Sequence, residues 1–126
     1  MHKSRLAGFI IDCNTADLPA AAAFWSAALG MQTTALGPGE EHYVGLTGGA
    51  HGLHIEVQQV QHDSRLHLDI ETDDIDAEAA RLEALGARRI GRVKSWWVMQ
   101  APTGQRFCVV AQSGGDFDAA ANRWDG

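Results

Sequence analysis

Apolar and polar positions along the chain follow the same succession of segments twice. In the first half, the apolar run Leu6–Cys13 predicts a buried strand, and an alanine-rich stretch from Asp17 to Leu29 predicts a helix. In the second half, Arg65–Thr72 predicts a strand and Asp74–Leu85 predicts a helix of similar length. Each helix has an acidic start and a Leu-Gly end, which are common capping signals. The repetition indicates two modules of related structure.

Short strand-like segments, separated by glycine and proline turns, follow each helix. After the first helix the predicted strands are Met31–Ala35, His42–Thr47 and Gly52–Val60. After the second helix they are Arg88–Val93, Ser95–Ala101 and Arg106–Ala111. The pattern predicts an α+β fold, with two tandem βαβββ modules at about 6–60 and 65–111 forming a curled mixed sheet around a cavity. The tail, 112–126, is predicted to form a short docked helix or to remain loose.

Alternation along the strands predicts which side chains lie under the helices and which face the cavity. The apolar set expected under the helices is Leu53, Ile55, Val57, Leu66, Leu68, Ile70, Phe107 and Val109. The intervening positions are expected to face the cavity, and they supply most of the candidate site: His54, Glu56, His67, Asp69, Arg106 and Cys108.

Two further strands contribute candidate ligand-binding residues. Asp12 is the polar residue embedded in the first apolar strand, and it faces the cavity together with Ile10 if Ile11 packs under the helix. Trp96 and Trp97 are adjacent on one strand, so they point to opposite faces. One tryptophan is expected under a helix, and the other is expected to line the cavity or an interface, where an aromatic wall suits a flat ligand.

Composition narrows the classes of function. A chain of 126 residues forms one domain or two small modules that share a core. The net charge of -6 argues against a nucleic-acid partner. No apolar run is long enough for a membrane span, and no signal-peptide pattern follows the first residues, so the expected location is the cytoplasm. Cys13 and Cys108 are too few for a disulfide scaffold, and His2 is assigned to a terminal arm.

The polar residues of the cavity face have alternative interpretations. His67 is a ligand or general base, or it is a histidine hydrogen-bonded across strands. Glu56 is a ligand or proton-transfer base, or it is paired with Arg65 or Arg106, because a buried carboxylate needs a partner. Arg106 binds an anionic group or lies on a solvated face. Cys108 is a buried small apolar residue or a thiolate ligand.

Several motifs together resemble the vicinal oxygen chelate superfamily, which includes glyoxalase I, bleomycin-resistance proteins and extradiol dioxygenases. The resemblance covers about 6–111 and is carried, in order, by Asp17-Leu18, Ala23-Phe24-Trp25, Leu29-Gly30, His67-Leu68-Asp69, Asp73-Asp74-Ile75, Leu85-Gly86-Ala87 and Ala101-Pro102-Thr103-Gly104-Gln105-Arg106-Phe107-Cys108. The chain is most similar to the glyoxalase-like domain subgroup, whose activities are mostly unassigned.

The resemblance implies a divalent-metal site with one ligand from each of four strands. Carried over by position, the four ligands fall on Ile10, Glu56, His67 and Cys108. Isoleucine cannot bind a metal, and cysteine stands where glutamate is expected, so Glu56 and His67 are the two that match. This pair alone would hold Mg²⁺, Mn²⁺ or Ni²⁺ poorly, whereas a Cys108 thiolate would favour Zn²⁺. Asp12 or His54 would supply a fourth donor only if the strand faces were shifted from the assignment given above.

Three functions therefore follow from the sequence and the resemblance. The first is a glyoxalase-like protein that binds a small molecule in its cavity, with an unassigned lyase or isomerase activity. The second is a metal-dependent enzyme like lactoylglutathione lyase or a dioxygenase. The third is a metal-free drug-binding protein of the bleomycin-resistance type. The resemblance also implies a homodimer. Where the protein is catalytic, the expected catalytic residues are Glu56 and His67, and the expected ligand-binding residues are Asp12, His54, Asp69, Trp96, Trp97, Arg106 and Cys108.

Overall fold

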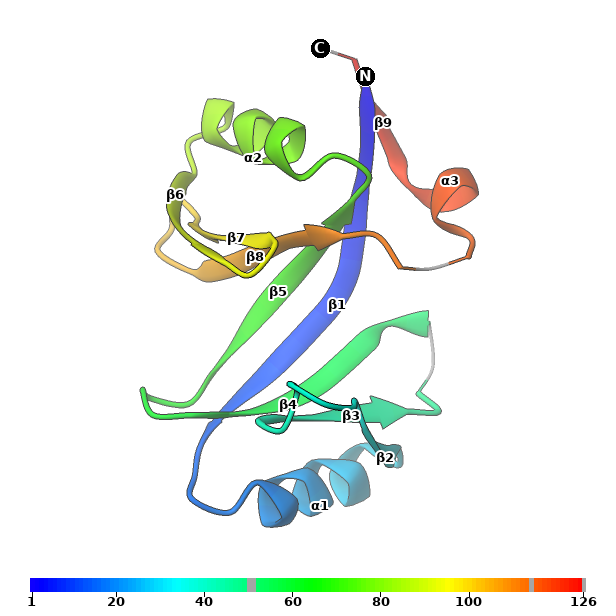
Figure 1. Cartoon of the computed structure of the whole chain (residues 1–126), viewed down its shortest axis with the longest axis vertical. Helices are drawn as coiled ribbons and strands as arrows, with labels where there is room; N and C mark the ends of the chain where they lie inside the picture. The colour runs from blue at the N-terminus through cyan, green and yellow to red at the C-terminus, as the bar shows by residue number, and fades with distance from the viewer. Residues whose placement is uncertain (50–51, 114, 126) are drawn as a thin grey trace. The chain divides into compact units, whose positions relative to one another are not determined.

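The computed structural model of the protein describes residues 1–49, 52–113 and 115–125. The chain divides into two compact units, which we call the α1 unit (Gly8–His67) and the α2 unit (Met1–Ala7 with Leu68–Gly126). Both units combine a helix with a mixed sheet (Figure 1), which confirms the α+β class. Within the described ranges, no helix has the length and apolar character needed to cross a bilayer. The elements are β1 (His2–Asn14), α1 (Leu18–Leu29), β2 (Gln32–Ala35), β3 (Tyr43–Thr47), β4 (His54–Val60), β5 (Arg65–Thr72), α2 (Ile75–Ala84), β6 (Arg88–Val93), β7 (Trp96–Gln100), β8 (Arg106–Ala111), α3 (Phe117–Ala120) and β9 (Asn122–Trp124).

The α1 unit packs its helix on strands in the order β2-β3-β4-β1. Strands β1 and β4 are parallel, while β2, β3 and β4 pair antiparallel. Helix α1 begins where the Asp17 carboxylate accepts a hydrogen bond from the Ala20 N–H at 3.0 Å. It ends at Gly30, whose φ of 67° is the left-handed conformation that glycine adopts without strain. The buried core under this helix consists of Leu18, Met31, Leu46 and Val57.

The α2 unit repeats the arrangement with strands in the order β5-β8-β7-β6. Strands β5 and β8 are parallel, and β7 pairs antiparallel with both β6 and β8. The Asp74 carboxylate caps α2 by accepting a hydrogen bond from the Ala77 N–H at 3.0 Å. The buried core under this helix consists of Ala79, Leu82, Met99 and Val109. The predicted repeat of strand, helix and three strands is therefore confirmed.

The C-terminal tail is folded onto the start of the chain. Helix α3 buries the Phe117 side chain, and strand β9 pairs antiparallel with the first residues of β1 (Figure 1), with His2 opposite Trp124. The docked helix was one of two predicted alternatives, but β9 was not predicted. Its pairing also explains why β1 begins at His2 and not at the predicted Leu6, because the first residues gain a hydrogen-bonding partner.

The assignment of His2 to a terminal arm is wrong, because its side chain is buried beside Glu78. The fully buried Glu78 carboxylate accepts a hydrogen bond from His2 Nε2 at 2.8 Å. It also accepts two hydrogen bonds from Arg81, from Nε and Nη2, each at 2.8 Å. The Arg81 guanidinium in turn lies 3.8 Å from the centroid of the Trp124 ring. Burial opposes the charge on Glu78, but the hydrogen bonds from Arg81 and His2 outweigh it, so the pKa of Glu78 lies below its ordinary value.

Two leucines of β5 depart from the predicted pattern. Leu66 and Leu68 were expected under a helix, yet they are 60% and 50% exposed. Helix α2 covers only the later part of β5, where Ile70 packs against the α2 core, so the alternation was right but the extent of the cover was wrong. The other members of the predicted set that pack against the two cores are Ile55, Val57, Phe107 and Val109.

We predict that Glu78→Gln lowers the free energy of unfolding by about 3 kcal/mol, because removing one partner leaves Arg81 and His2 with an incomplete set of acceptors. Urea unfolding midpoints would measure this cost. The matched control is Glu83→Gln, whose carboxylate is 43% exposed and pairs with Arg89 at 2.9 Å. An exposed pair contributes less than about 1 kcal/mol. Equal costs for the two variants would contradict the structural role of Glu78.

The difference in the free energy of unfolding between the wild type and Glu78→Gln should also depend on pH. Because the folded-state pKa of Glu78 is lowered, its contribution is fully present above the ordinary glutamate value of about 4.3 and is lost as the pH falls through the lowered pKa. The difference in stability between wild type and Glu78→Gln should therefore narrow under acidic conditions.

Candidate functional site

The candidate site in the α1 unit is built around Asp12, a carboxylate that is 2% exposed on β1. In the parallel pair of β1 and β4, Ile10 is in register with Glu56, so these two side chains lie on the same face as Asp12. Cys13, on the opposite face of β1, packs against the α1 core. This confirms the conditional prediction that Ile10 and Asp12 face away from the helix. We call this surface the Asp12 face.

His67 at the start of β5 is held by Asp12. The distance from His67 Nδ1 to Asp12 Oδ2 is 2.8 Å, and the Arg65 Nε lies 3.7 Å from the same oxygen. A carboxylate oxygen accepts, so Nδ1 is the donor of this hydrogen bond, and in the neutral form of the imidazole this leaves the lone pair on Nε2. Within the part of the chain that the structure describes, the buried Asp12 Oδ1 has no hydrogen-bond partner. Asp12 thus orients His67 through one carboxylate oxygen and retains the other without a hydrogen bond among the described residues.

Glu56, on β4, is 15% exposed and hydrogen-bonds His54 Nε2. The His54 side chain is 55% exposed, so it connects a mostly buried carboxylate to solvent. The alternative that Glu56 is paired with Arg65 or Arg106 is wrong: Arg65 lies beside Asp12, and Arg106 donates to Gln100 Oε1 at 3.2 Å. Glu56 therefore has a titratable partner and not a permanent cation.

The two predicted catalytic residues lie on either side of β1. Strand β4 carries Glu56, strand β5 carries His67, and β1 lies between these two strands in the sheet. Neighbouring strands are about 4.8 Å apart, so a small molecule can contact both side chains at once. Between them, the 3% exposed Ile10 supplies an apolar floor. The arrangement offers one acid–base group on each side of a bound ligand.

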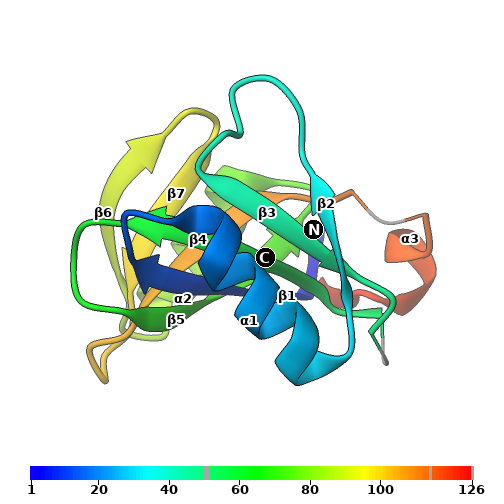
Figure 2. The same cartoon turned by 90° about the horizontal axis from the view of Figure 1, so that it is seen from below.

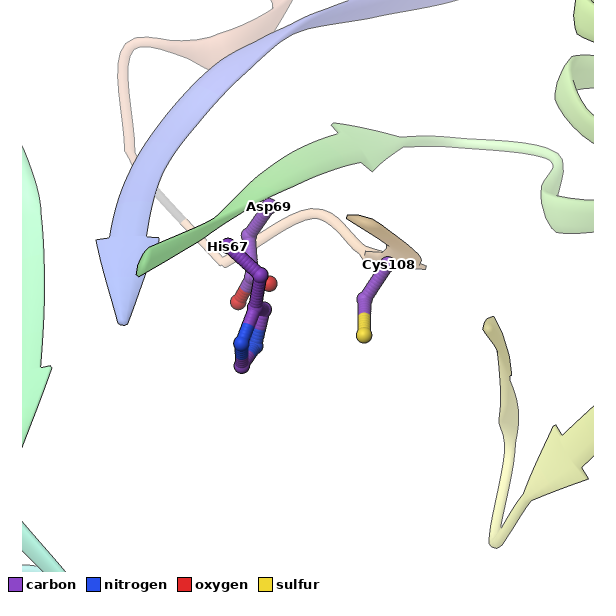
Figure 3. Close-up of side chains that lie close together, drawn as sticks. All are labelled: His67, Asp69 and Cys108. Carbon is purple, nitrogen blue, oxygen red and sulfur yellow. The ribbon is translucent and has the colours of Figure 1, made fainter. Parts of the chain in front are cut away.

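Further along β5, the side chains of His67 and Asp69 lie close to that of Cys108 on β8 (Figure 3). Their potential ligand atoms all lie within 4.8 Å of one another. The spacing follows from the strands, because His67 and Asp69 are alternate residues of β5 and Asp69 is in register with Cys108. Imidazole, carboxylate and thiolate form a donor set that suits Zn²⁺ better than a hard octahedral ion. Glu56, predicted as a metal ligand, is not part of this group.

The two tryptophans separate as alternation requires. Trp97 packs against the α2 core, and its Nε1 donates to Asp76 Oδ1 at 3.1 Å. Trp97 is thus the tryptophan under the helix, so its proposed role in ligand binding does not fit its position. Its register partner on this face is Val109. Trp96 lies on the other face of the same strand, the face that carries Cys108.

The two cysteines also lie on different faces. Both are half-buried, and neither forms a disulfide. Burial raises the pKa of the Cys13 thiol, which lies against the α1 core and plays no part in the site. Cys108 is the thiol that shares a surface with a candidate donor, Asp69.

The interpretation of His67 as a histidine hydrogen-bonded across strands is confirmed, but its partner, Asp12, was not predicted. The signal in the sequence was a single carboxylate inside an otherwise apolar strand, since such a group is retained in a buried position only with a partner. Which partner it takes depends on the pairing between β1 and β5, which no local pattern specifies.

Comparisons with solved structures find the same fold in several proteins. A hypothetical protein from Bacillus halodurans C-125 matches with a TM-score of 0.65 at 10% identity, covering 89% of this chain and 97% of that one. Methylmalonyl-CoA epimerase from Mycobacterium tuberculosis matches with a TM-score of 0.60 at 15% identity, covering 91% of each chain. A Streptomyces coelicolor methylmalonyl-CoA epimerase variant in complex with 2-nitronate-propionyl-CoA gives 0.56 at 17% identity, covering 86% and 98%. At these identities the likeness shows the fold alone.

A search of curated proteins gave no significant match. The sequence profile of one family, described as "Glyoxalase-like domain", matches residues 8–110, which is most of the chain. This match confirms the resemblance seen in the motifs, and the solved neighbours confirm the fold that it implied. The chain belongs to the glyoxalase-like domain family.

Proposed function

We propose that the protein binds a small carbonyl compound on the Asp12 face and that Glu56 and His67 transfer a proton at the carbon next to the carbonyl. The observation that carries this proposal is that the two residues stand on the strands on either side of β1, with His67 hydrogen-bonded to Asp12. The reaction class is an isomerase or lyase, in agreement with the first of the three functions expected from the sequence.

The proton transfer can be written with these residues alone. His67 Nε2 accepts the proton from the carbon of the ligand, and the buried Asp12 carboxylate stabilises the imidazolium that forms. The electron pair of the broken C–H bond moves into the carbonyl to give an enolate. Protonated Glu56 then returns a proton to the opposite face of that carbon, which inverts its configuration. His54, half exposed and hydrogen-bonded to Glu56, exchanges protons with solvent and resets the pair.

The solved neighbours suggest the first substrates to test. Two of them are methylmalonyl-CoA epimerases, and one of these is in complex with 2-nitronate-propionyl-CoA. An acyl thioester has an acidified carbon next to its carbonyl, so it suits the proposed chemistry. A homodimer and a cytoplasmic location, both expected above, remain predictions.

A second candidate is a zinc-dependent activity, favoured by the close approach of His67, Asp69 and Cys108. The three donor types fit Zn²⁺, and Asp12 fits the role of a carboxylate that orients a histidine ligand. When bound there, the metal would polarise a carbonyl oxygen of the ligand. His67 would then hold the metal, and Glu56 would be the residue that takes the proton.

Deuterium exchange tests whether Glu56 and His67 transfer a proton at the carbon next to the carbonyl. With a panel of α-substituted acyl-CoA thioesters in D₂O, we expect the wild type to introduce one deuterium at the α-carbon of a substrate and to invert it. Glu56→Gln and His67→Gln should each slow inversion at least about 100-fold, the usual contribution of a general acid or base. Each variant should still exchange the proton of one stereoisomer, because one base remains. Mass spectrometry and chiral chromatography of the products would measure both effects.

Matched controls for this experiment are Glu83→Gln and His42→Gln, which change the same residue types outside the Asp12 face. Both should exchange and invert at the wild-type rate. Inversion at the wild-type rate in Glu56→Gln or His67→Gln would contradict the two-base proposal, as would the absence of exchange with every thioester of the panel.

The tautomer of His67 tests whether Asp12 positions this imidazole. In ¹⁵N NMR spectra, wild-type His67 should be in the Nδ1–H form that the Asp12 hydrogen bond requires. In Asp12→Asn the carboxylate charge is lost, and the Nε2–H form should become populated. His42, whose Nδ1 lies 3.3 Å from Gln59 Oε1, serves as an internal reference that should not change. An unchanged His67 spectrum would remove Asp12 from its positioning role.

Zinc retention distinguishes the zinc-dependent candidate from the two-base candidate. If the zinc candidate holds, protein equilibrated with ZnSO₄ and then dialysed should retain about one zinc per chain by elemental analysis. Cys108→Ser and Asp69→Asn should then lose most of this metal, while Cys13→Ser keeps it. Retention of zinc by the first two variants would exclude the donor set proposed here. Exchange activity that survives a chelator would favour the two-base candidate.

A further inference from the structure

The α1 unit also has a hollow that is separate from the Asp12 face. It has a volume of about 1050 Å³ and lies between helix α1 and the hairpin of β2 and β3. Figures 1 and 2 both place α1 against these strands. Because the α1 side of the sheet is the side toward which Cys13 packs, the hollow is on the opposite side from Asp12. We call it the α1 groove.

The groove exists because the helix surface that borders it is made of very small side chains. The contribution of α1 and the residues before it includes Ala16, Ala22, Ala23, Ser26 and Ala27. Of the helix residues, Leu18 and Ala22 are buried. Side chains that end at Cβ do not reach the hairpin, so space remains between the helix and the wall formed by Leu36 and Val44. The lining is mainly apolar and large enough for an organic molecule.

The charges that line the α1 groove have one sign. Glu40 and Glu41 line it, and its described lining residues include no lysine, arginine or histidine. Tyr43 also lines the groove. An apolar hollow with a negative margin complements a ligand that has an apolar body and a positive charge.

The loop that carries the glutamates is held by its own hydrogen bonds. The Gly39 N–H donates to Glu41 Oε1 at 3.1 Å. The Glu40 N–H donates to the Gly37 carbonyl at 3.1 Å, and the Tyr43 N–H donates to the Glu40 carbonyl at 3.1 Å. Gly37 and Gly39 have φ values of 106° and 83°, a region that disfavours other residues, so this turn depends on glycine. The two carboxylates are therefore presented from a defined backbone.

We propose that the α1 groove binds an amphipathic organic cation, with its apolar body against the alanines of α1 and its ammonium group at Glu40 and Glu41. The proposal is independent of proton transfer on the Asp12 face, since the two sites use opposite sides of the sheet and share no residue. It adds a second, ligand-selective site to a domain whose proposed chemistry lies elsewhere.

The test uses three probes with the same apolar body: 4-phenylbutylamine, 4-phenylbutanol and 4-phenylbutyrate. Titrations followed by ¹H–¹⁵N NMR on the full chain should move signals from α1 and from the loop between β2 and β3. We expect the amine to bind about tenfold more tightly than the alcohol, a difference of about 1.4 kcal/mol. The carboxylate should bind more weakly still.

Two sets of variants separate the charge from the apolar body. The double variant Glu40→Gln with Glu41→Gln should remove the preference for the amine and leave binding of the alcohol unchanged. Ala23→Leu and Ala27→Leu should fill the groove and weaken binding of both the amine and the alcohol. Asp118→Asn, which changes an 89% exposed carboxylate in the α2 unit, is the matched control and should bind all three probes as the wild type does.

Three outcomes would overturn the proposal. One is equal affinity of the wild type for the amine and the alcohol. Another is an unchanged preference in the double glutamine variant while its unfolding midpoint matches that of the wild type. The third is signal movement confined to residues of the Asp12 face, which would place the cation in the site of the proposed proton transfer.

Discussion

A carboxylate placed inside an apolar strand constrains the whole candidate site. Asp12 is almost completely buried, and a buried charge is tolerated only if it is hydrogen-bonded or paired. The protein meets this requirement with His67 and, more distantly, with Arg65. The consequence is chemical as well as structural, because the same hydrogen bond assigns the proton to His67 Nδ1 and the lone pair to Nε2. The structure thus gains an oriented base from the partner that the buried charge requires.

A second buried carboxylate in the α2 unit is used differently. Glu78 is surrounded by Arg81 and His2, and its pKa is lowered because these hydrogen bonds outweigh the effect of burial. It is also connected to the two ends of the chain, through His2 on β1 and through the stacking of Arg81 on Trp124. Every strong donor around Glu78 comes from a rigid element, so its role is to hold β9 and α2 in place. Asp12, by contrast, retains an oxygen without a partner in the described part of the chain, which is what a site requires.

The sequence was sufficient to predict the helices and most of the strands. It was not sufficient to predict which parts of the sheet the helices cover. Helix starts at Asp17 and Asp74 and the stop at Gly30 could be predicted because capping depends on a few adjacent residues. The exposure of Leu66 could not, because it depends on how far α2 extends over β5. Strand β9 was missed for a related reason: a three-residue strand has no periodicity of its own and forms only because β1 offers a free edge.

Within the candidate site, alternation assigned residues to faces correctly but could not choose among them. It required Trp96 and Trp97 to separate, and the packing of Trp97 against the α2 core and its hydrogen bond to Asp76 show that Trp97 is the one under α2. It placed Glu56 on the same face as His67, yet the partner of Glu56 is His54, two residues along the same strand, and not an arginine from another strand. Contacts between strands depend on register, which is fixed by the whole sheet.

Ile10 is the position at which this chain departs most clearly from the metal-ligand pattern implied by its resemblance to the vicinal oxygen chelate superfamily. By position, Ile10 replaces the first expected ligand, and it lies in register with Glu56 at the centre of the Asp12 face. A metal held by Glu56 would therefore have an apolar neighbour on β1 where a donor is required. The donors that do approach one another are displaced along β5 to His67, Asp69 and Cys108. The isoleucine at position 10 thus fits the two candidates proposed above, in which Glu56 acts as an acid or base and a metal is held by donors further along β5.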